Sequence, residues 1–168
     1  MSLIGILTDT KNEKIIKNIL NEKLNLDKNI IIINDKNIEN FKNVSFETIL
    51  ITNNNIIKNK QIHLVKIISN TRFLVINADI EMDLEIYQGD GLNVITFGFN
   101  PKATITASSV EEEILLCIQR DIVDINNNTI FQQELKIETN NNKFISINNL
   151  IGIATILLLY KNRKIDKK

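Results

Sequence analysis

Short apolar runs alternate with helical patterns over the first hundred residues. The runs, rich in Ile, Leu and Val, occupy residues 3–7, 30–33, 48–52, 73–76 and 93–97. Continuous runs of this kind are typical of strands that are buried on both faces of a parallel sheet. Between the first two runs, and again before the fourth, apolar side chains recur three and four positions apart, as on one face of a helix. This alternation predicts an α/β fold with a mostly parallel sheet.

The two helical patterns have defined starts and faces. The first helix is predicted to open at Thr10-Lys11-Asn12-Glu13, which has the S/T-x-x-E pattern of a capping box. The second helix is predicted from about Lys58 to Ser69. The side chains expected on the inner faces of the two helices are Ile15, Ile16, Ile19 and Leu20 in the first, and Gln61, Leu64, Val65 and Ile68 in the second.

The pattern changes after Pro101. Residues 104–107 alternate in polarity, and residues 114–123 and 129–137 flank the turn-forming run Asn126–Asn128, as in an antiparallel hairpin. Ser109-Val110-Glu111-Glu112 is a second capping-box pattern, so a helix from Ser109 is the alternative interpretation. A last helix is predicted from about Asn148 to Tyr160, followed by a short basic tail at 161–168.

Together these elements predict one domain over residues 1–168, with a three-layer, Rossmann-like arrangement and a small antiparallel extension of the sheet. The length is sufficient for a core that needs no disulfide or metal.

Composition narrows the function classes. Lys and Arg together number 20, as do Asp and Glu, so no basic field favours nucleic acid as a partner. A single cysteine, Cys117, excludes an internal disulfide and is typical of a reducing compartment. The apolar stretch at 150–160 is about half the roughly 20 residues that a membrane-spanning helix needs, so it predicts a buried helix. No signal-peptide pattern opens the chain, so we expect a cytoplasmic protein that binds neither nucleic acid nor membrane.

Several motifs resemble the central domain of Mur ligases, the ATP-dependent enzymes that add amino acids to peptidoglycan precursors. Leu74-Val75-Ile76-Asn77-Ala78-Asp79 is similar to the V-x-N-A-D-D strand end of that family. Residues 94–99 are similar to the V-I-T-Y-G segment of the family, and residues 103–107 to the strand that follows it. Upstream, residues 48–53 resemble a strand that ends in T-N. Downstream, residues 149–155 resemble the closing H-N-x-x-N-A-x-A-A helix. The order and spacing of these segments also match. The resemblance implies the central-domain fold of the family.

Departures from the family pattern remove the ligase chemistry that the resemblance would otherwise imply. The turn after the first strand, Thr8 to Glu13, lacks the glycines and the G-K-[ST] arrangement with which a P-loop binds phosphates. Asp9 and Glu13 instead place negative charge there. Asn54-Asn55-Ile56-Ile57 stands where the family has an Asp-His pair. We therefore expect no catalytic residues, no cofactor and no ATP-dependent ligase activity.

Three further departures concern single positions and the flanking domains. Lys66 lies near the position of the family's carboxylated lysine, which holds Mg²⁺ beside ATP and has no such role without a P-loop. Asn148 stands in place of the closing helix's His, and Gly152 in place of its second Asn. The family's N-terminal UDP-substrate domain and C-terminal domain have no counterpart in the sequence.

No metal site is expected. His63, the only histidine, lies in a predicted helix without ligands at the spacing that metals require, so we interpret it as a surface or packing residue. Cys117, in an apolar strand pattern, is interpreted as an inert buried thiol. Asp79, Glu81, Asp83 and Glu85 alternate after a strand end and could bind Mg²⁺ or Ca²⁺, although a solvated acidic loop explains them better.

Three functions from different classes are consistent with the sequence. The first is a non-catalytic interaction or scaffold module linked to cell-wall precursor metabolism, forming a homodimer or pairing with a Mur-ligase-like protein. The sequence does not identify its contact surface, although the end of the last helix, Leu157–Tyr160, has more apolar residues than one buried stripe requires. The alternative is a small-molecule binder that holds a nucleotide or UDP-linked precursor without hydrolysing ATP. Its ligand contacts would be Thr8, Asn53, Asn77 and Asp79. A metal-dependent residual enzyme using the acidic cluster is the third, although no nucleophile or base accompanies that cluster.

Overall fold

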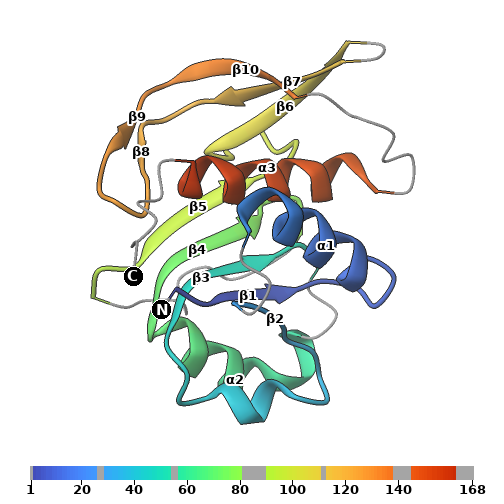
Figure 1. The fold of residues 1–168 in the computed structure, drawn as a ribbon, viewed down its shortest axis with the longest axis vertical. Helices are drawn as coiled ribbons and strands as arrows, with labels where there is room; N and C mark the ends of the chain where they lie inside the picture. Colours follow the sequence, from blue (N-terminus) through green and yellow to red (C-terminus); the bar gives the residue numbers. More distant parts are fainter. Residues whose placement is uncertain are drawn as a thin grey trace.

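The computed structural model describes residues 2–25, 29–53, 57–80, 90–110, 113–137 and 145–161. The described residues form an eight-stranded sheet in the order β10-β7-β6-β5-β4-β3-β1-β2, and a separate ribbon of β8 and β9 (Figure 1). The strands are β1 (Ile4–Leu7), β2 (Ile30–Ile32), β3 (Phe46–Ile51), β4 (Thr71–Asn77), β5 (Asn93–Phe97), β6 (Ile105–Val110), β7 (Glu113–Ile118), β8 (Ile122–Val123), β9 (Thr129–Ile130) and β10 (Gln133–Ile137). The helices are α1 (Glu13–Leu24), the 3₁₀ helix η1 (Ile38–Phe41), α2 (Ile57–Ile68) and α3 (Ile147–Tyr160).

The sheet is parallel from β2 through β1, β3, β4 and β5 to β6, and antiparallel from β6 through β7 to β10. The predicted parallel sheet with an antiparallel extension is therefore confirmed. The predicted hairpin is also present: β8 pairs with β9 around the Asn126–Asn128 turn, and β7 pairs with β10. The helical alternative is wrong, because Ser109 and Val110 lie in β6 and residues 113–118 form β7. Residues 111 and 112 lie outside the described part.

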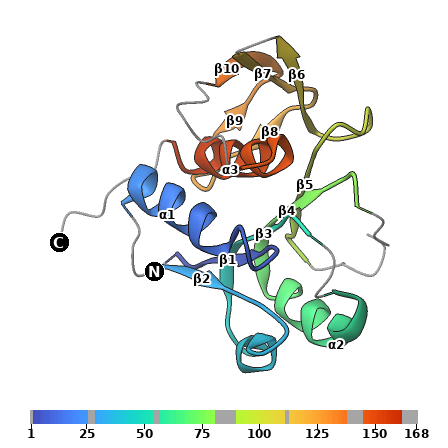
Figure 2. The same ribbon diagram turned by 90° about the vertical axis from the view of Figure 1, so that its right-hand side faces the viewer.

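Helices cover both faces of the parallel sheet, which gives three layers (Figures 1 and 2). One face packs against α1 and α3, with Leu50, Phe73, Val75 and Phe97 in the shared core. The other face packs against η1 and α2 through Leu7, Ile49, Ile51, Leu74 and Ile76. Each central strand thus contributes apolar side chains to two cores, which explains why its sequence is continuously apolar.

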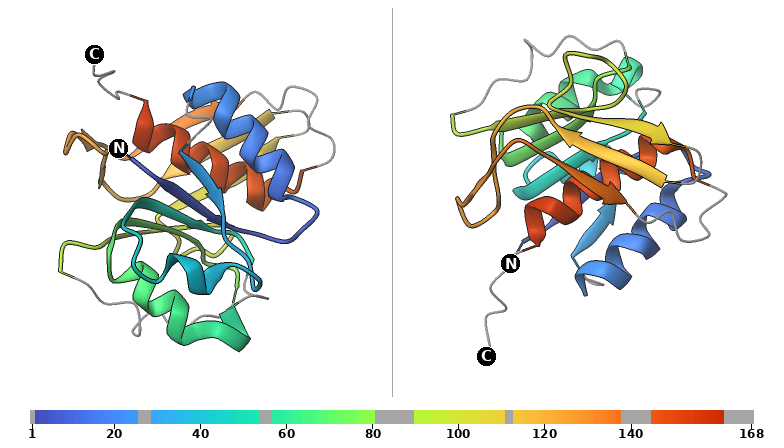
Figure 3. Two further views of the ribbon diagram at one scale, coloured as in Figure 1. Left: turned by 60° about the horizontal axis from the view of Figure 1, so that its bottom comes forward. Right: turned by 90° about the horizontal axis from the view of Figure 1, so that it is seen from above.

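The last helix is enclosed between two parts of one sheet. Figures 1 and 3 show β6, β7 and β10 passing over α3 on the side opposite to β4 and β5. Ala107, Ile114 and Leu116 of the extension share one core with Ile151 and Ile156 of the helix. Because both sides of α3 are covered, its sequence is apolar nearly all round.

The buried helix that the sequence predicts at 150–160 is confirmed, and the suggestion that its end, Leu157–Tyr160, contributes to a contact surface is wrong. Leu159 and Tyr160 are buried, and Leu157 and Leu158 pack half-buried against the same core. The Tyr160 hydroxyl also lies 2.9 Å from Thr48 Oγ1, which ties the end of the helix to β3.

Two details of the predicted helices are also corrected. Thr10 does not cap α1, which begins at Glu13 after a turn that the Asp9 carboxylate closes. In α2, Gln61 is exposed, and the buried face comprises Leu64, Ile67 and Ile68. Within the described residues, none of the helices is both long and apolar enough to cross a membrane.

Candidate ligand-binding site

The parallel strands end together at one edge of the sheet. Leu7 is aligned with Ile51, Ile51 with Ile76, and Asn77 with Phe97, so the carboxyl ends of β1, β3, β4 and β5 form a row. Ligands of open α/β sheets bind at this edge. The four residues that the sequence singled out, Thr8, Asn53, Asn77 and Asp79, all lie at or just after these strand ends.

Hydrogen bonds join three of these four residues into a network along the edge. Thr52 Oγ1 donates to Thr8 Oγ1 at 2.6 Å, and both threonines are buried. Asn77 Nδ2 lies 3.4 Å from the Thr52 carbonyl oxygen, and its Oδ1 accepts from the Asp79 amide at 2.9 Å. Asn53 follows β3 and is half-buried. The network holds the strand ends together and leaves Thr8 little exposed surface for a ligand.

Asp79 organises the loop that connects β5 to β6. Its carboxylate accepts hydrogen bonds from the Phe99 amide at 2.8 Å and from the Asn100 amide at 2.7 Å. Gly98, with φ of 138°, approaches the carboxylate so closely that a Cβ there would lie 2.6 Å from Asp79 Oδ2. Asp79 therefore positions this loop, and its contact with a ligand stays a prediction.

A second carboxylate closes the turn between β1 and α1. Asp9 Oδ1 accepts the Lys11 and Asn12 amides, each at 3.1 Å, and Asp9 Oδ2 accepts from Asn12 Nδ2 at 2.7 Å. In a P-loop, backbone amides at this position face the phosphates of the nucleotide. Because the Asp9 carboxylate already accepts these amides and carries negative charge, the turn disfavours a bound triphosphate.

We therefore expect that millimolar Mg-ATP is not hydrolysed, and that Lys11→Ala leaves any ATP-dependent change in melting temperature unaltered. Phosphate release and thermal unfolding with and without Mg-ATP measure both effects. As a control on the structural role of the turn, Asp9→Ala should lower stability by about 1 kcal/mol, because two amides lose their acceptor. A saturable ATPase that is lost in Lys11→Ala would contradict the expectation.

A cavity of about 420 Å³ opens at the carboxyl ends of β4 and β5. Apolar side chains, hydrogen-bonding side chains and two cations line it: Ile76, Asn77, Ala78, Ile80, Thr96, Asn100, Lys102 and Arg120. Asn77 is the one predicted site residue that lines the cavity. Its size lies within the range of small-ligand pockets, about 300–1,000 Å³.

The strand registers explain why Lys102 and Arg120 meet at this cavity. Phe97 at the end of β5 is aligned with Ile105 at the start of β6, and Ile105 is aligned with Ile118 at the end of β7. The loop carrying Lys102 and the segment carrying Arg120 therefore lie beside the same strand end. The Gln119 amide donates to the Thr104 carbonyl at 2.9 Å, and the Thr96 and Thr104 hydroxyls lie 3.1 Å apart.

Neither Lys102 nor Arg120 forms an ion pair with another described residue. Asp79 directs both carboxylate oxygens to backbone amides, and Asp121, which follows Arg120 in the sequence, accepts from the Gln132 amide. The described residues that line the cavity thus carry net positive charge. A small anion is the ligand that such a lining favours.

No protein-family model matches the sequence, and a search of curated proteins finds no match. The Mur ligase resemblance therefore rests on the motifs at residues 48–53, 74–79, 94–99, 103–107 and 149–155, and it stays a prediction.

The remaining candidate residues have structural surroundings. His63 Nε2 lies 3.8 Å from Glu39 Oε1, and the Lys60 ammonium contacts the same oxygen at 2.7 Å. The hydrogen bond and the positive charge of Lys60 lower the pKa of Glu39. The described residues contain no group of three or more His, Cys, Asp or Glu side chains suited to a metal ion. Glu81, Asp83 and Glu85 of the predicted acidic cluster lie outside the described part.

Cys117 is half-buried in β7. Burial, and after it the charge of the neighbouring Glu134 carboxylate, raise the pKa of the Cys117 thiol. The Sγ atom lies 3.8 Å from Glu134 Oε1. A raised pKa keeps the thiol protonated and poorly nucleophilic, consistent with the inert cysteine that the sequence predicts.

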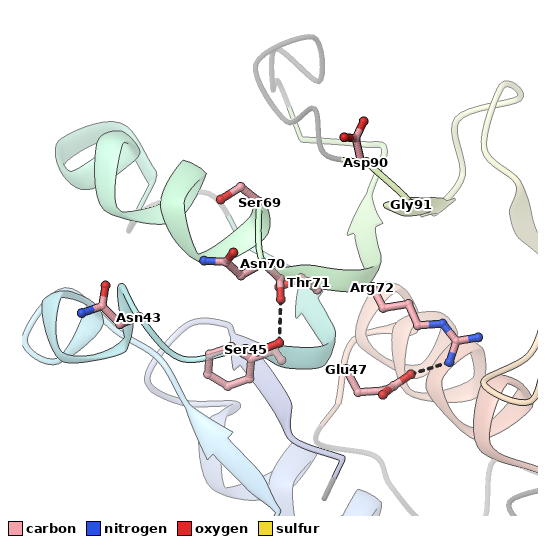
Figure 4. A pocket seen from close by; sticks show the side chains of 10 residues that line it. Asn43, Ser45, Glu47, Ser69, Asn70, Thr71, Arg72, Asp90 and Gly91 are labelled. Atoms are coloured by element: carbon pink, nitrogen blue, oxygen red, sulfur yellow. Dashed lines mark hydrogen bonds and ion pairs between the residues drawn. The ribbon is translucent and has the colours of Figure 1, made fainter.

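A second cavity, of about 660 Å³, lies at the amino ends of β3 and β4, around Ser45, Asn70 and Arg72 (Figure 4). Its polar groups bind one another: Arg72 contacts Glu47 at 2.8 Å, and Ser45 Oγ donates to the Asn70 carbonyl at 3.0 Å. Arg72 also donates to the Ile125 carbonyl and to Asn127 Oδ1. This arginine anchors the turn between β8 and β9, so the cavity is a weaker ligand candidate.

Proposed function

We propose that this protein is a non-catalytic binding domain for a small anionic molecule, held in the cavity at the carboxyl ends of β4 and β5. One observation carries the proposal: Lys102 and Arg120, from separate segments of the chain, line one cavity without an ion-pair partner among the described residues. Unpaired cations beside a strand-end cavity favour a phosphate or carboxylate group.

Each part of the lining has a role in this proposal. The Arg120 guanidinium can bind a phosphate or carboxylate through two parallel hydrogen bonds, and the Lys102 ammonium adds a compact positive charge. Asn77 and Thr96 offer an amide and a hydroxyl to the polar part of the ligand. Ile76, Ala78 and Ile80 offer an apolar wall to the rest. A nucleotide or a UDP-linked precursor has this combination of groups.

Binding without catalysis is favoured by the composition of the lining. The described lining residues contain no carboxylate, imidazole or thiol. Carboxylate, imidazole and thiol groups are the commonest general acids, bases and nucleophiles, and a lysine ammonium or a threonine hydroxyl such as those of Lys102 and Thr96 has to be activated before it can react. The closed turn at Asp9 further supports a ligand that binds away from the former nucleotide position.

The proposal predicts that UDP and inorganic pyrophosphate raise the melting temperature, whereas uridine, which lacks phosphate, does not. A ligand that binds the native state alone must stabilise it. Lys102→Ala and Arg120→Ala are each expected to weaken binding about tenfold, or about 1.4 kcal/mol. Higher salt should weaken it further, because exposed charges are screened. Isothermal titration calorimetry measures the affinities.

Lys23→Ala is the matched control, because Lys23 is an exposed cation in the last turn of α1, far along the chain from both cavity cations. Its substitution should leave affinity unchanged. Equal affinity in Lys102→Ala, Arg120→Ala and Lys23→Ala would contradict the proposal, and so would a failure of both phosphorylated probes to bind the unaltered protein.

A further inference from the structure

The extended sheet ends in a strand with a self-complementary sequence. β10 (Gln133–Ile137) is the last strand of the sheet order and pairs with β7 on one side (Figure 3). Its five residues read Gln133-Glu134-Leu135-Lys136-Ile137, with opposite charges on either side of a central leucine. The unpaired backbone groups of an edge strand are a template for pairing with another chain.

The side chains of β10 alternate between two surroundings. Gln133, Leu135 and Ile137 are aligned with Ile118, Leu116 and Ile114 of β7. Leu116 and Ile114 belong to the core around α3, and Ile118 is also buried. Leu135 and Ile137 pack half-buried against that core. Glu134 and Lys136 are exposed on the opposite face of the strand.

We propose that β10 pairs antiparallel with β10 of a second copy of this chain, about a two-fold axis at Leu135. In this register Glu134 of each copy lies opposite Lys136 of the other, and the two Leu135 side chains lie opposite each other. Two cross-strand pairs of opposite charge form on the exposed face, and an apolar contact forms on the face toward α3. A two-fold contact uses the same strand of both copies, so it covers the β10 edge of each sheet.

The charge pattern selects this register over its neighbours. A slip by two residues places Glu134 opposite Glu134, or Lys136 opposite Lys136, and like charges directly opposite destabilise a strand pair. A parallel arrangement in register has the same defect. A slip by one residue opposes charged side chains to apolar ones and exchanges the two faces.

The opposite edge of the sheet is a poorer surface for pairing. β2 comprises three residues, Ile30–Ile32, and none of them carries a charge that could define a register. The exposed apolar side chains of the described residues also do not suggest a common surface, because Ile62, Val94, Phe99, Phe131 and Ile147 come from different elements and loops.

Charge reversal tests this dimer without altering the core. The unaltered protein is expected to be a dimer at tens of micromolar, as measured by sedimentation equilibrium. Glu134→Lys and Lys136→Glu should each weaken self-association at least tenfold, because each creates like-charge pairs in the two-fold register. An equimolar mixture of the two variants should form a heterodimer, since both cross-strand pairs are again opposite in charge. The double variant Glu134→Lys/Lys136→Glu should dimerise as the unaltered protein does.

Unchanged thermal unfolding of the single variants, followed by circular dichroism, would show that they fold. A monomeric unaltered protein would overturn the proposal. So would single variants that associate normally, or a mixture of the two that fails to associate. These outcomes are independent of ligand binding, because β10 contributes no residue to the cavity at Lys102 and Arg120.

Discussion

Leu159→Lys is expected to unfold the protein rather than to alter its association. Leu159 has 0% exposure and packs in the core that α3 shares with both parts of the sheet. The substitution removes a buried leucine, worth about 2–3 kcal/mol, and places an ammonium where no water reaches it. The combined loss, at least about 5 kcal/mol, is comparable to the whole stability of many single domains. Urea unfolding followed by circular dichroism measures it.

Ile62→Lys is the matched control, because it also replaces an apolar residue of a helix by lysine. Ile62 lies in α2 and is 72% exposed, so the change should stay within about 0.5 kcal/mol. A Leu159→Lys protein that is as stable as Ile62→Lys would show that the end of α3 is exposed.

The apolar pattern predicts the elements of this fold better than it predicts their surroundings. Runs buried on both sides identified β1, β3 and β4, because each contributes to the two cores. The pattern of α3 predicts a buried helix but not its surroundings, because helix periodicity reports how much of a helix is covered but not by what. The surplus of apolar residues at Leu157–Tyr160 packs under the antiparallel extension, which comes from chain far from the helix in sequence.

The sequence places its four candidate ligand contacts at the carboxyl ends of the parallel strands, and the cavity there is lined in addition by residues that the sequence did not indicate. Parallel topology alone places Thr8, Asn53 and Asn77 at the carboxyl edge. The sequence does not indicate that Arg120 lies near this edge, because Arg120 reaches it through the antiparallel register of β7 with β6. Lys102 lies in a loop and has no sequence pattern around it. That register depends on long-range pairing, and isolated cations in loops give no local signal.

Local hydrogen bonds give two acidic residues structural roles that the sequence did not indicate. Asp79 was predicted to contact a ligand, yet its carboxylate accepts amides of the loop after β5, twenty residues away in sequence. The capping-box pattern predicts Thr10 as the residue that accepts the amides before α1, whereas the Asp9 carboxylate accepts them. In both cases a side-chain oxygen closes a loop, a role that short polar residues share with ligand binding.

Gly152→Asn restores the residue that the Mur ligase resemblance places in the closing helix, and it is expected to destabilise the protein by about 3 kcal/mol. A Cβ at Gly152 would lie 2.8 Å from Phe97 Cζ and 3.2 Å from Leu50 Cδ1. The helix must therefore shift, and overpacking of this kind costs about 1–3 kcal/mol. The side-chain amide of the asparagine would in addition lie against an aromatic ring and a methyl group. Without a hydrogen-bond partner there, it lowers the stability by about another 1–3 kcal/mol.

Gly152→Ala separates the steric part from the polar part. Alanine gains about 1 kcal/mol of helix propensity over glycine but meets the same Phe97 contact, so the net loss should be about 1 kcal/mol or less. Phe97→Leu removes the closest ring atoms, and in a double-mutant cycle it should recover at least about 1 kcal/mol of the Gly152→Asn loss. Thermal and urea unfolding of the four proteins give the coupling energy. If Gly152→Asn is as stable as the unaltered protein, α3 does not approach β5 as closely as the fold requires, and an asparagine at this position would again be compatible with the family's contacts.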